Sequence, residues 1–348
     1  MPSLPNEHFD IYSARNVPDS HSWPTEHHVT VARDSSFPVV DISAPGTAVA
    51  VGAACRSWGA FYVTGHGVPE DLLRRVEAQA RRLFALPHHR KLLAARRSGS
   101  TSGYGPPPLS SFFPKLMWSE GFTLAGDPLD VAAKLWQDDH SLFCEVMEEY
   151  GKEMKKLANR LMKVILLSLG LDEEKAGRVG PVKELTRAPS VLQLNSYPPC
   201  PEPDQAMGMA AHTDSGFLTV LHQSDGAGGL QVVGPGEGNG PVRWIAVPPR
   251  ADALVVNVGD LFHILSNGRF KSVRHRVVVN RGDHRVSAAY FIGPPADVKV
   301  GPIRWLLGSD QGPVFRPVTW PEYLGIRARL FDKALDSVRL PGNRIDDD

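Results

Sequence analysis

Residues 285–292 have the sequence Arg-Val-Ser-Ala-Ala-Tyr-Phe-Ile, and this short run, rich in β-branched and aromatic residues, decides the fold class. Turn residues stand on both sides of it, at 280–283 and at 293–295. Other short runs after residue 189 alternate with Gly, Pro, Asn and Asp in the same way, at 191–197, 218–221, 229–233, 243–247, 253–258 and 273–280. Short strands at this spacing are typical of a β-sandwich or barrel, so we expect a mainly β core.

The residue pattern of the N-terminal half is different and predicts helices. A helix is expected from Pro69, because proline suits the first turn and Glu70 and Asp71 suit the positive end of the helix dipole. A longer helix is expected near 138–171, where apolar residues recur every three or four positions. They are Phe143, Met147, Tyr150, Met154, Leu157, Leu161 and Ile165.

Four segments follow from these patterns. Residues 1–36 are polar and aperiodic and are expected to form a loosely ordered arm, and 37–185 an N-terminal helical domain. Residues 186–295 hold the β core, and 296–348 a C-terminal segment with a helix near 320–339. We also expect strands at 37–41, on a sheet edge, and at 59–63.

Charge and cysteine content narrow the function class. Lys and Arg number 38, as do Asp and Glu, and a net charge of zero argues against a protein that works by neutralising phosphates. Three cysteines, Cys55, Cys144 and Cys200, cannot all pair within the chain, which favours reduced thiols. With no signal peptide or membrane-spanning run, we expect a cytoplasmic monomer, with the nucleus as a second location, that binds neither nucleic acid nor membrane.

Two histidines and one aspartate form the candidate metal site. His212 and Asp214 stand two positions apart, so on a strand both would point to one face. Alone, such a pair is more often a buried histidine bonded to an aspartate. His275, on another expected strand, adds a third ligand, and a set of two imidazoles and one carboxylate leaves coordination positions open, which suits oxygen-activating Fe(II). A structural zinc site would instead use four ligands, usually including cysteine.

A second pair of residues is suited to a carboxylate. Arg285 and Ser287 share a face of their expected strand, and a guanidinium binds a carboxylate through two parallel hydrogen bonds. Tyr197, on an earlier strand, offers a phenol to the same end. A lone arginine at such a position is more often solvated, but the pair would suit a dicarboxylate that chelates the metal with its other end.

These motifs, in this order, resemble those of the plant-type 2-oxoglutarate/Fe(II)-dependent dioxygenases. The resemblance implies a double-stranded β-helix (jelly roll) core with a helical N-terminal region. It implies Fe(II) on His212, Asp214 and His275, and 2-oxoglutarate held by its far carboxylate. The groups implied to hold that carboxylate are Arg285, Ser287 and Tyr197. The co-substrates would be 2-oxoglutarate and O2, with ascorbate as the reductant.

Within that family, segments 110–121, 148–157 and 255–270 are similar to gibberellin 3-oxidases. The resemblance implies 3β-hydroxylation of a gibberellin, a rigid apolar tetracycle with a carboxylate, in plant hormone biosynthesis. Gly216, Phe217 and Arg274 depart from the family's pattern beside the iron ligands, so we expect them, with the loop 105–122, to line the substrate pocket.

Other functions remain open at this stage. A gibberellin oxidase acting at C-1, at C-2 or by ring desaturation, or a flavonoid-type dioxygenase, would use the same iron chemistry. A catalytically inactive binding module could share the scaffold. A zinc hydrolase with two histidines and one aspartate would leave Arg285 and Ser287 without a role.

Overall fold

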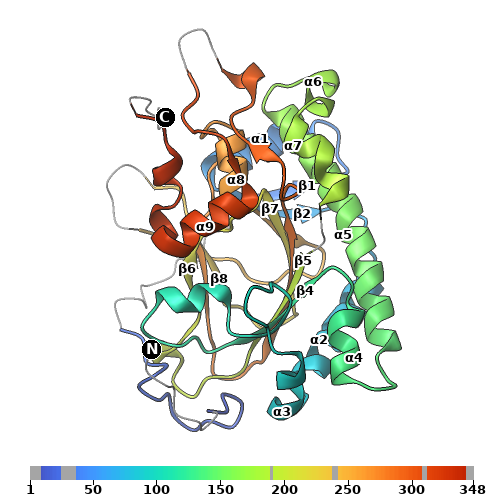
Figure 1. Ribbon diagram of the computed structural model, residues 1–348, viewed down its shortest axis with the longest axis vertical. Coiled ribbons are helices and arrows are strands. Elements are labelled where there is room, and N and C mark those ends of the chain that lie inside the picture. Colours follow the sequence, from blue (N-terminus) through green and yellow to red (C-terminus); the bar gives the residue numbers. More distant parts are fainter. Residues whose placement is uncertain (1–8, 25–36, 189–190, 237–241, 308–311, 342–348) are drawn as a thin grey trace.

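Two β-sheets face each other across a cavity in the computed structural model, which describes residues 9–24, 37–188, 191–236, 242–307 and 312–341 (Figure 1). In these ranges the larger sheet has eight strands in the order β1-β2-β10-β7-β12-β5-β4-β3, and the smaller has the order β6-β11-β8-β9. The strands of the larger sheet are β1 (Val39–Asp41), β2 (Ala60–Thr64), β10 (Leu254–Val258), β7 (Leu218–Gln223), β12 (Arg285–Ile292), β5 (Val191–Tyr197), β4 (Glu120–Ala125) and β3 (Gly103–Gly105). Those of the smaller are β6 (Met207–His212), β11 (His275–Val278), β8 (Leu230–Val233) and β9 (Trp244–Ala246), and β13 (Lys299–Val300) pairs with β14 (Val318–Thr319) apart from both.

The chain winds between the two sheets from β5 onward. β5, β7, β10 and β12 belong to the larger sheet, whereas β6, β8, β9 and β11 belong to the smaller. This back-and-forth path is the double-stranded β-helix, or jelly roll, that the sequence predicts, with strands from the N-terminal region widening the larger sheet.

Helices pack on the outside of the larger sheet. Helix α5 contacts α1, α2, α4 and strand β12, and Figure 1 shows it lying along one side of the sheet. All seven of its predicted apolar positions are buried, and it ends just before Gly170, whose φ of 85° closes the helix. The helices are α1 (Thr47–Ser57), α2 (Glu70–Phe84), α3 (His88–Lys91), α4 (Leu129–Leu135), α5 (Ser141–Ser168), α6 (Glu173–Gly177), α7 (Gly180–Lys183), α8 (Asp260–Leu265) and α9 (Trp320–Leu330).

Several sequence expectations are confirmed and others are corrected. Strands β5 and β12 have the predicted bounds, and β1 lies on a sheet edge as predicted. The expected loop at 105–122 is wrong at its end, because β4 begins at Glu120. The expected helix at 320–339 is also shorter, since α9 ends at Leu330 and 3₁₀ turns follow.

Part of the N-terminal arm is packed rather than loosely ordered. Val17 and Trp23 are buried, and the Trp23 indole N–H donates to the Leu116 carbonyl at 2.9 Å. The Tyr12 hydroxyl bonds to Ser196 at 2.7 Å. Residues 9–24 therefore form part of the folded structure, while 1–8 and 25–36 lie outside the described residues.

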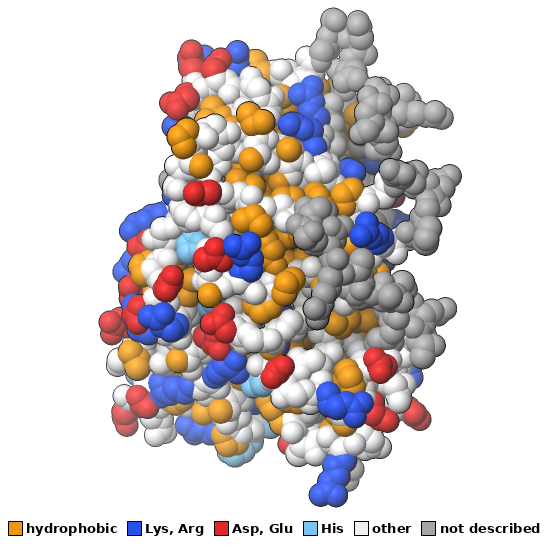
Figure 2. Space-filling model, turned by 180° about the vertical axis from the view of Figure 1, so that it is seen from behind, with side chains coloured by type: hydrophobic (Ala, Val, Ile, Leu, Met, Phe, Trp, Pro, Cys, Tyr) orange, Lys and Arg blue, Asp and Glu red, His pale blue; other side chains and the backbone are white. Residues whose placement is uncertain are grey.

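The surface carries mixed charge. Figure 2 shows Lys and Arg interspersed with Asp and Glu over the coloured part of one face, with apolar side chains between them. Across the described ranges, none of the helices has the length and apolar character needed to cross a membrane.

A buried ion pair ties helix α3 to the sheet. Lys91 Nζ lies 2.7 and 2.8 Å from the two carboxylate oxygens of Glu120, and both residues are less than 10% exposed. The Tyr104 hydroxyl donates to the same carboxylate at 2.5 Å. Within the described residues, each charge is balanced mainly by its partner, with hydrogen bonds and the rings of Tyr12 and Tyr104 near Lys91 as further support.

We predict that Lys91→Met lowers the free energy of unfolding by about 3–5 kcal/mol, because it leaves the Glu120 carboxylate buried without a cation. Urea unfolding followed by circular dichroism measures the loss. Lys156→Met is the matched control, since Lys156 pairs with Glu153 at 2.6 Å but its side chain is 73% exposed, and we expect it to have little effect. Equal losses in the two variants would contradict the prediction.

Candidate metal centre and co-substrate cavity

His212, Asp214 and His275 meet at one point of the cavity wall. Their candidate ligand atoms all lie within 4.8 Å of one another. The Nε2 atoms of His212 and His275 are each 3.8 Å from Asp214 Oδ1. Atoms at such separations can each approach a common ion to about 2 Å with small adjustments.

Backbone pairing brings the two imidazoles together. His275 on β11 is the register partner of His212 on β6, and their ring centroids are 4.2 Å apart. Nδ1 of His212 lies 2.8 Å from the Ala210 carbonyl, and Nδ1 of His275 lies 3.2 Å from the Val273 carbonyl. Because a carbonyl only accepts, each Nδ1 carries a proton, which leaves Nε2 as the nitrogen of each ring that can bind a metal ion.

Asp214 does not lie on the strand, contrary to the reasoning from period two. Strand β6 ends at His212, and Asp214 sits in the following turn. The Thr219 hydroxyl donates to Asp214 Oδ2 at 2.6 Å, and the Asp260 N–H donates to the Asp214 carbonyl at 2.8 Å. The turn thus brings the carboxylate to the histidines by these bonds rather than by strand alternation.

The protonation states of His212 and Asp214 favour the binding of a cation by the cluster. Burial, with the adjacent His275, lowers the pKa of His212 to about 3, so this imidazole is neutral at pH 7 and can act as a ligand. Burial raises the pKa of Asp214, but the two histidines and the Thr219 hydroxyl outweigh it, so the net pKa lies below its usual value. The cluster therefore holds one negative charge in a largely enclosed place.

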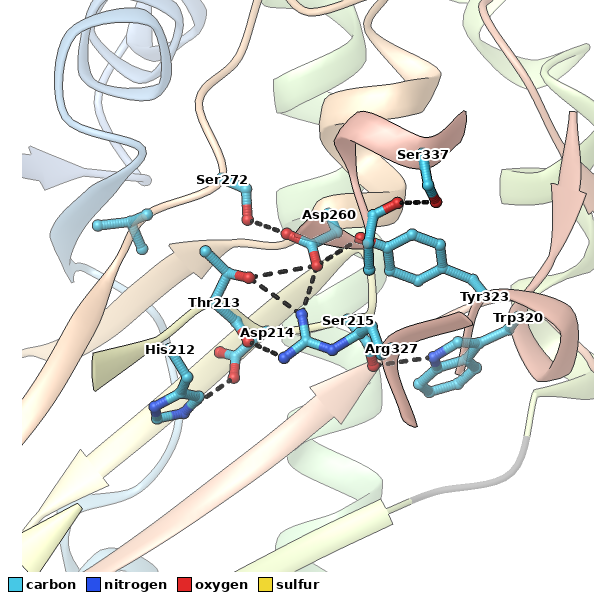
Figure 3. A network of polar contacts seen from close by, with 12 residues as sticks. His212, Thr213, Asp214, Ser215, Asp260, Ser272, Trp320, Tyr323, Arg327 and Ser337 are labelled. Atoms are coloured by element: carbon cyan, nitrogen blue, oxygen red, sulfur yellow. Dashed lines mark hydrogen bonds and ion pairs between the residues drawn. The ribbon is translucent and has the colours of Figure 1, made fainter. Parts of the chain in front are cut away.

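Arg327 of helix α9 hydrogen-bonds to the turn that carries Asp214 (Figure 3). Arg327 donates to the Thr213 carbonyl at 2.8 Å and to the Thr213 hydroxyl at 3.0 Å, and it forms an ion pair with Asp260 at 2.5 Å. The Tyr323 hydroxyl donates to Asp260 at 2.8 Å, and the Ser272 hydroxyl at 2.6 Å. This network joins α8, α9 and the turn between β6 and β7, and nothing in the sequence pattern pointed to Arg327.

The second predicted group lies on β12 and β5. Arg285 is 1% exposed and its guanidinium stands over the Tyr197 ring at 4.9 Å. It donates to Gln223 at 2.8 Å and lies 3.5 Å from the Ser287 hydroxyl. Its Nε has no hydrogen-bond partner, and no carboxylate of the described residues forms an ion pair with it. A buried cation without an anion calls for an anionic ligand.

Both groups line one cavity of about 390 Å³ between the sheets. Alternate residues of β5 and β12 face it, as period two requires. They are Val191, Gln193, Asn195 and Tyr197, and Arg285, Ser287, Ala289 and Phe291. From the predicted loop, Pro107 and Leu109 reach the cavity; Arg96, Ser100, Thr101 and Thr123 also line it and were not singled out in the sequence.

The three residues expected in the substrate pocket do not lie among the lining residues. Phe217 is 0% exposed and packs in the hydrophobic core against Phe262. Its neighbour Gly216 lies against the end of β12, where an added Cβ would stand 2.7 Å from the Ile292 carbonyl oxygen. Arg274 is exposed.

Comparisons with known proteins agree with this geometry. The sequence matches the profile of the 2OG-Fe(II) oxygenase superfamily over residues 188–294, and that of the non-haem dioxygenase in morphine synthesis N-terminal family over residues 37–142. The chain belongs to the 2OG-Fe(II) oxygenase superfamily. It is 46% identical to Gibberellin 3-beta-dioxygenase 1 of Pisum sativum, over 96% of this chain and 90% of that protein. It is also 46% identical to Gibberellin 3-beta-dioxygenase 1 of Arabidopsis thaliana, over 97% and 94%.

Solved structures of this superfamily share the fold. The chain resembles the crystal structure of JOX2 in complex with 2OG, Fe and JA, with a TM-score of 0.82, 30% identity, and coverage of 98% of this chain and 100% of that one. It also resembles a dioxygenase for auxin oxidation in rice, with a TM-score of 0.72, 30% identity, and coverage of 88% and 100%.

Membership in the superfamily sets the cofactor requirement. This oxygenase needs Fe(II), 2-oxoglutarate and O2. The donor set of the cluster fits Fe(II), because two imidazoles and one carboxylate from three positions leave room for 2-oxoglutarate and O2.

We predict that Arg327→Met weakens Fe(II) binding by about 10- to 100-fold, because loss of the guanidinium frees the turn that carries Asp214. Anaerobic titration of the metal-free enzyme with Fe(II) measures the dissociation constant. Arg329→Met is the matched control, since Arg329 lies exposed on the same helix. An unchanged dissociation constant in Arg327→Met would show that the network does not position the ligands.

Proposed function

We propose that this enzyme hydroxylates a gibberellin at carbon 3 in the β orientation, using Fe(II), 2-oxoglutarate and O2. The observation that carries the proposal is the 46% identity, over nearly the whole chain, to proteins named gibberellin 3-beta-dioxygenase. The cavity beside the metal cluster supports it, because Met209, Leu221, Leu230, Val277 and Phe291 give its wall the apolar surface that a rigid apolar ligand needs.

We propose that His212, Asp214 and His275 hold Fe(II), with the two Nε2 atoms and the Asp214 carboxylate as ligands. Their mutual distances and the protonation of both Nδ1 atoms support this role. Bound Fe(II) supplies the reaction in which O2 and 2-oxoglutarate give succinate and CO2, and one oxygen atom enters a substrate C–H bond.

We propose that Arg285 and Ser287 hold the far carboxylate of 2-oxoglutarate, beside the Tyr197 phenol. The unpaired, buried guanidinium supports this role, as does the shared cavity with the metal cluster. The apolar wall, which includes Leu221 and Leu230, would exclude water from the reacting atoms.

We propose a cytoplasmic location, which the state of the thiols supports. Cys55, Cys144 and Cys200 are free and buried, which supports a reducing compartment and the expected cytoplasmic location. The described residues of one chain supply both the metal cluster and the carboxylate site, which supports action as a monomer.

The test is product analysis. Purified enzyme with Fe(II), 2-oxoglutarate and ascorbate is given a panel of gibberellins, and products are identified by mass spectrometry and NMR. We expect 3β-hydroxylated product with substrate-dependent succinate release. Oxidation at C-1 or C-2, ring desaturation, or turnover of flavonoids alone would overturn the position or the substrate. Absence of succinate release with every substrate would favour a binding module, and hydrolysis without O2 uptake a zinc hydrolase.

We predict that His212→Ala, Asp214→Ala and His275→Ala each abolish turnover and lower Fe(II) affinity, because each removes one of three protein ligands. Thermal unfolding checks that each variant is folded, and anaerobic Fe(II) titration checks the metal. Substantial Fe(II)-dependent activity in any folded variant would overturn the ligand assignment.

We predict that Arg285→Lys raises the Michaelis constant for 2-oxoglutarate about tenfold or more and leaves Fe(II) affinity unchanged, because lysine keeps the charge but loses the two-pronged contact. Initial rates at varied 2-oxoglutarate, with anaerobic Fe(II) titration alongside, measure both effects. An unchanged Michaelis constant would place the carboxylate site elsewhere in the cavity.

A further inference from the structure

Two permanently charged cations line the catalytic cavity, Arg285 and Arg96. The first has a proposed partner in 2-oxoglutarate, whereas the second has none. The Arg96 guanidinium donates to the Pro106 carbonyl at 3.1 Å and to the Thr123 hydroxyl at 3.0 Å. Both acceptors are neutral, so they fix the orientation of the guanidinium without balancing its charge.

The charge of Arg96 stays unbalanced within the described part of the chain. No carboxylate there forms an ion pair with it, and its Nε is buried without a hydrogen-bond partner. Burial lowers the pKa of Arg96, and no neighbouring anion acts in the opposite direction. A guanidinium remains protonated all the same, so this half-buried cation can pair with an anionic ligand that enters the cavity.

Arg96 lies on a different side of the cavity from the metal cluster. Its partner Thr123 is on β4, while Thr219, which bonds to Asp214, is on β7. In the order β7-β12-β5-β4 these strands are three spacings apart, roughly 14 Å at the level of the backbone. Side chains reach inward from both, so the gap suits a molecule of a few fused rings.

Apolar and polar side chains share the cavity wall. Met209, Leu221, Leu230, Val277 and Phe291 supply apolar surface, whereas Gln193, Asn195, Thr219 and Asn257 are polar, and Ser100 and Thr101, which follow Arg96 in sequence, also line the cavity. The arrangement fits a rigid apolar ligand that carries a single carboxylate at one end and presents a C–H bond to the metal cluster at the other.

We propose that Arg96 binds the carboxylate of the substrate and so sets the enzyme's preference for carboxylic acids. This inference rests on the proposed function, because it names the contact that orients a gibberellin acid in the cavity. One N–H of each terminal nitrogen would remain on the Pro106 carbonyl or the Thr123 hydroxyl, and the second N–H of each would be available to the carboxylate.

Recognition of the charge can be separated from a merely structural role of Arg96. If the residue only supports Pro106 and Thr123, its loss weakens binding of every substrate alike. If it pairs with a carboxylate, its loss weakens binding of the acid but not of the uncharged methyl ester. Comparing acid and ester therefore isolates the charge contact.

The experiment compares wild type, Arg96→Gln, Arg96→Lys and the control Arg97→Gln, each with a monocarboxylic gibberellin and its methyl ester. Arg97 is the exposed neighbour, so its variant makes the same chemical change outside the cavity. Dissociation constants are measured by calorimetry on the holoenzyme with 2-oxoglutarate and without O2, and Michaelis constants by product formation.

We expect Arg96→Gln to raise both the dissociation constant and the Michaelis constant for the acid about 10- to 100-fold. The constants for the ester, and the concentration of 2-oxoglutarate that gives half-maximal rate, should change little. Arg96→Lys should recover part of the preference for the acid, and Arg97→Gln should match wild type. An acid-to-ester ratio in Arg96→Gln equal to that of wild type would overturn the proposal.

Failure of the proposed function gives a different result. If wild type binds and oxidises no gibberellin, the substrate is wrong. If wild type oxidises gibberellins but binds acid and ester equally, the role of Arg96 is wrong while the function stands. That second comparison needs no variant, so it decides the matter even if Arg96→Gln fails to fold.

Discussion

Alternation of side chains along β5 and β12 is the constraint on which the site depends. The two strands pair from Arg285 and Tyr197 at one end to Phe291 and Val191 at the other, and every second pair faces the cavity. The intervening residues, such as Leu194, are buried in the core on the helix side. A slip of one residue would bury polar groups among the helices, so hydrophobic burial sets the register that places the ligand-binding groups.

The cavity combines one buried and one half-buried guanidinium group with a compact cluster of negative charge. Arg285 and Arg96 lack carboxylate partners among the described residues, whereas Asp214 lies beside the imidazoles of His212 and His275. In the proposed assignment, Fe(II), the far carboxylate of 2-oxoglutarate and the substrate carboxylate each meet a group of opposite charge on the wall of one cavity. A ligand that binds only the folded chain also stabilises it, so cofactor and substrate contribute to the stability of the core.

The sequence predicts well what depends on local pattern. A mainly β core follows from short strands and turns, the jelly roll is what the resemblance to the dioxygenases implies, and the bounds of β5 and β12 are predictable because period two is visible over seven or eight residues. What depends on distant packing is not predictable in this way. Asp214 is held by groups beyond its strand, Phe217 is turned into the core, and Arg96 and Arg327 acquire their surroundings only when remote elements fold together.

The hydrogen bonds between α9 and the turn after β6 have a genetic consequence. Every proposed ligand of iron and of 2-oxoglutarate is encoded before residue 290, while Tyr323 and Arg327 lie more than thirty positions further on. An allele whose reading frame shifts between these regions would retain all recognisable motifs. It would still lose Tyr323 and Arg327, and with them the hydrogen bonds that hold the iron-binding turn. Such an allele would be scored as intact by its motifs and would behave as a loss-of-function allele.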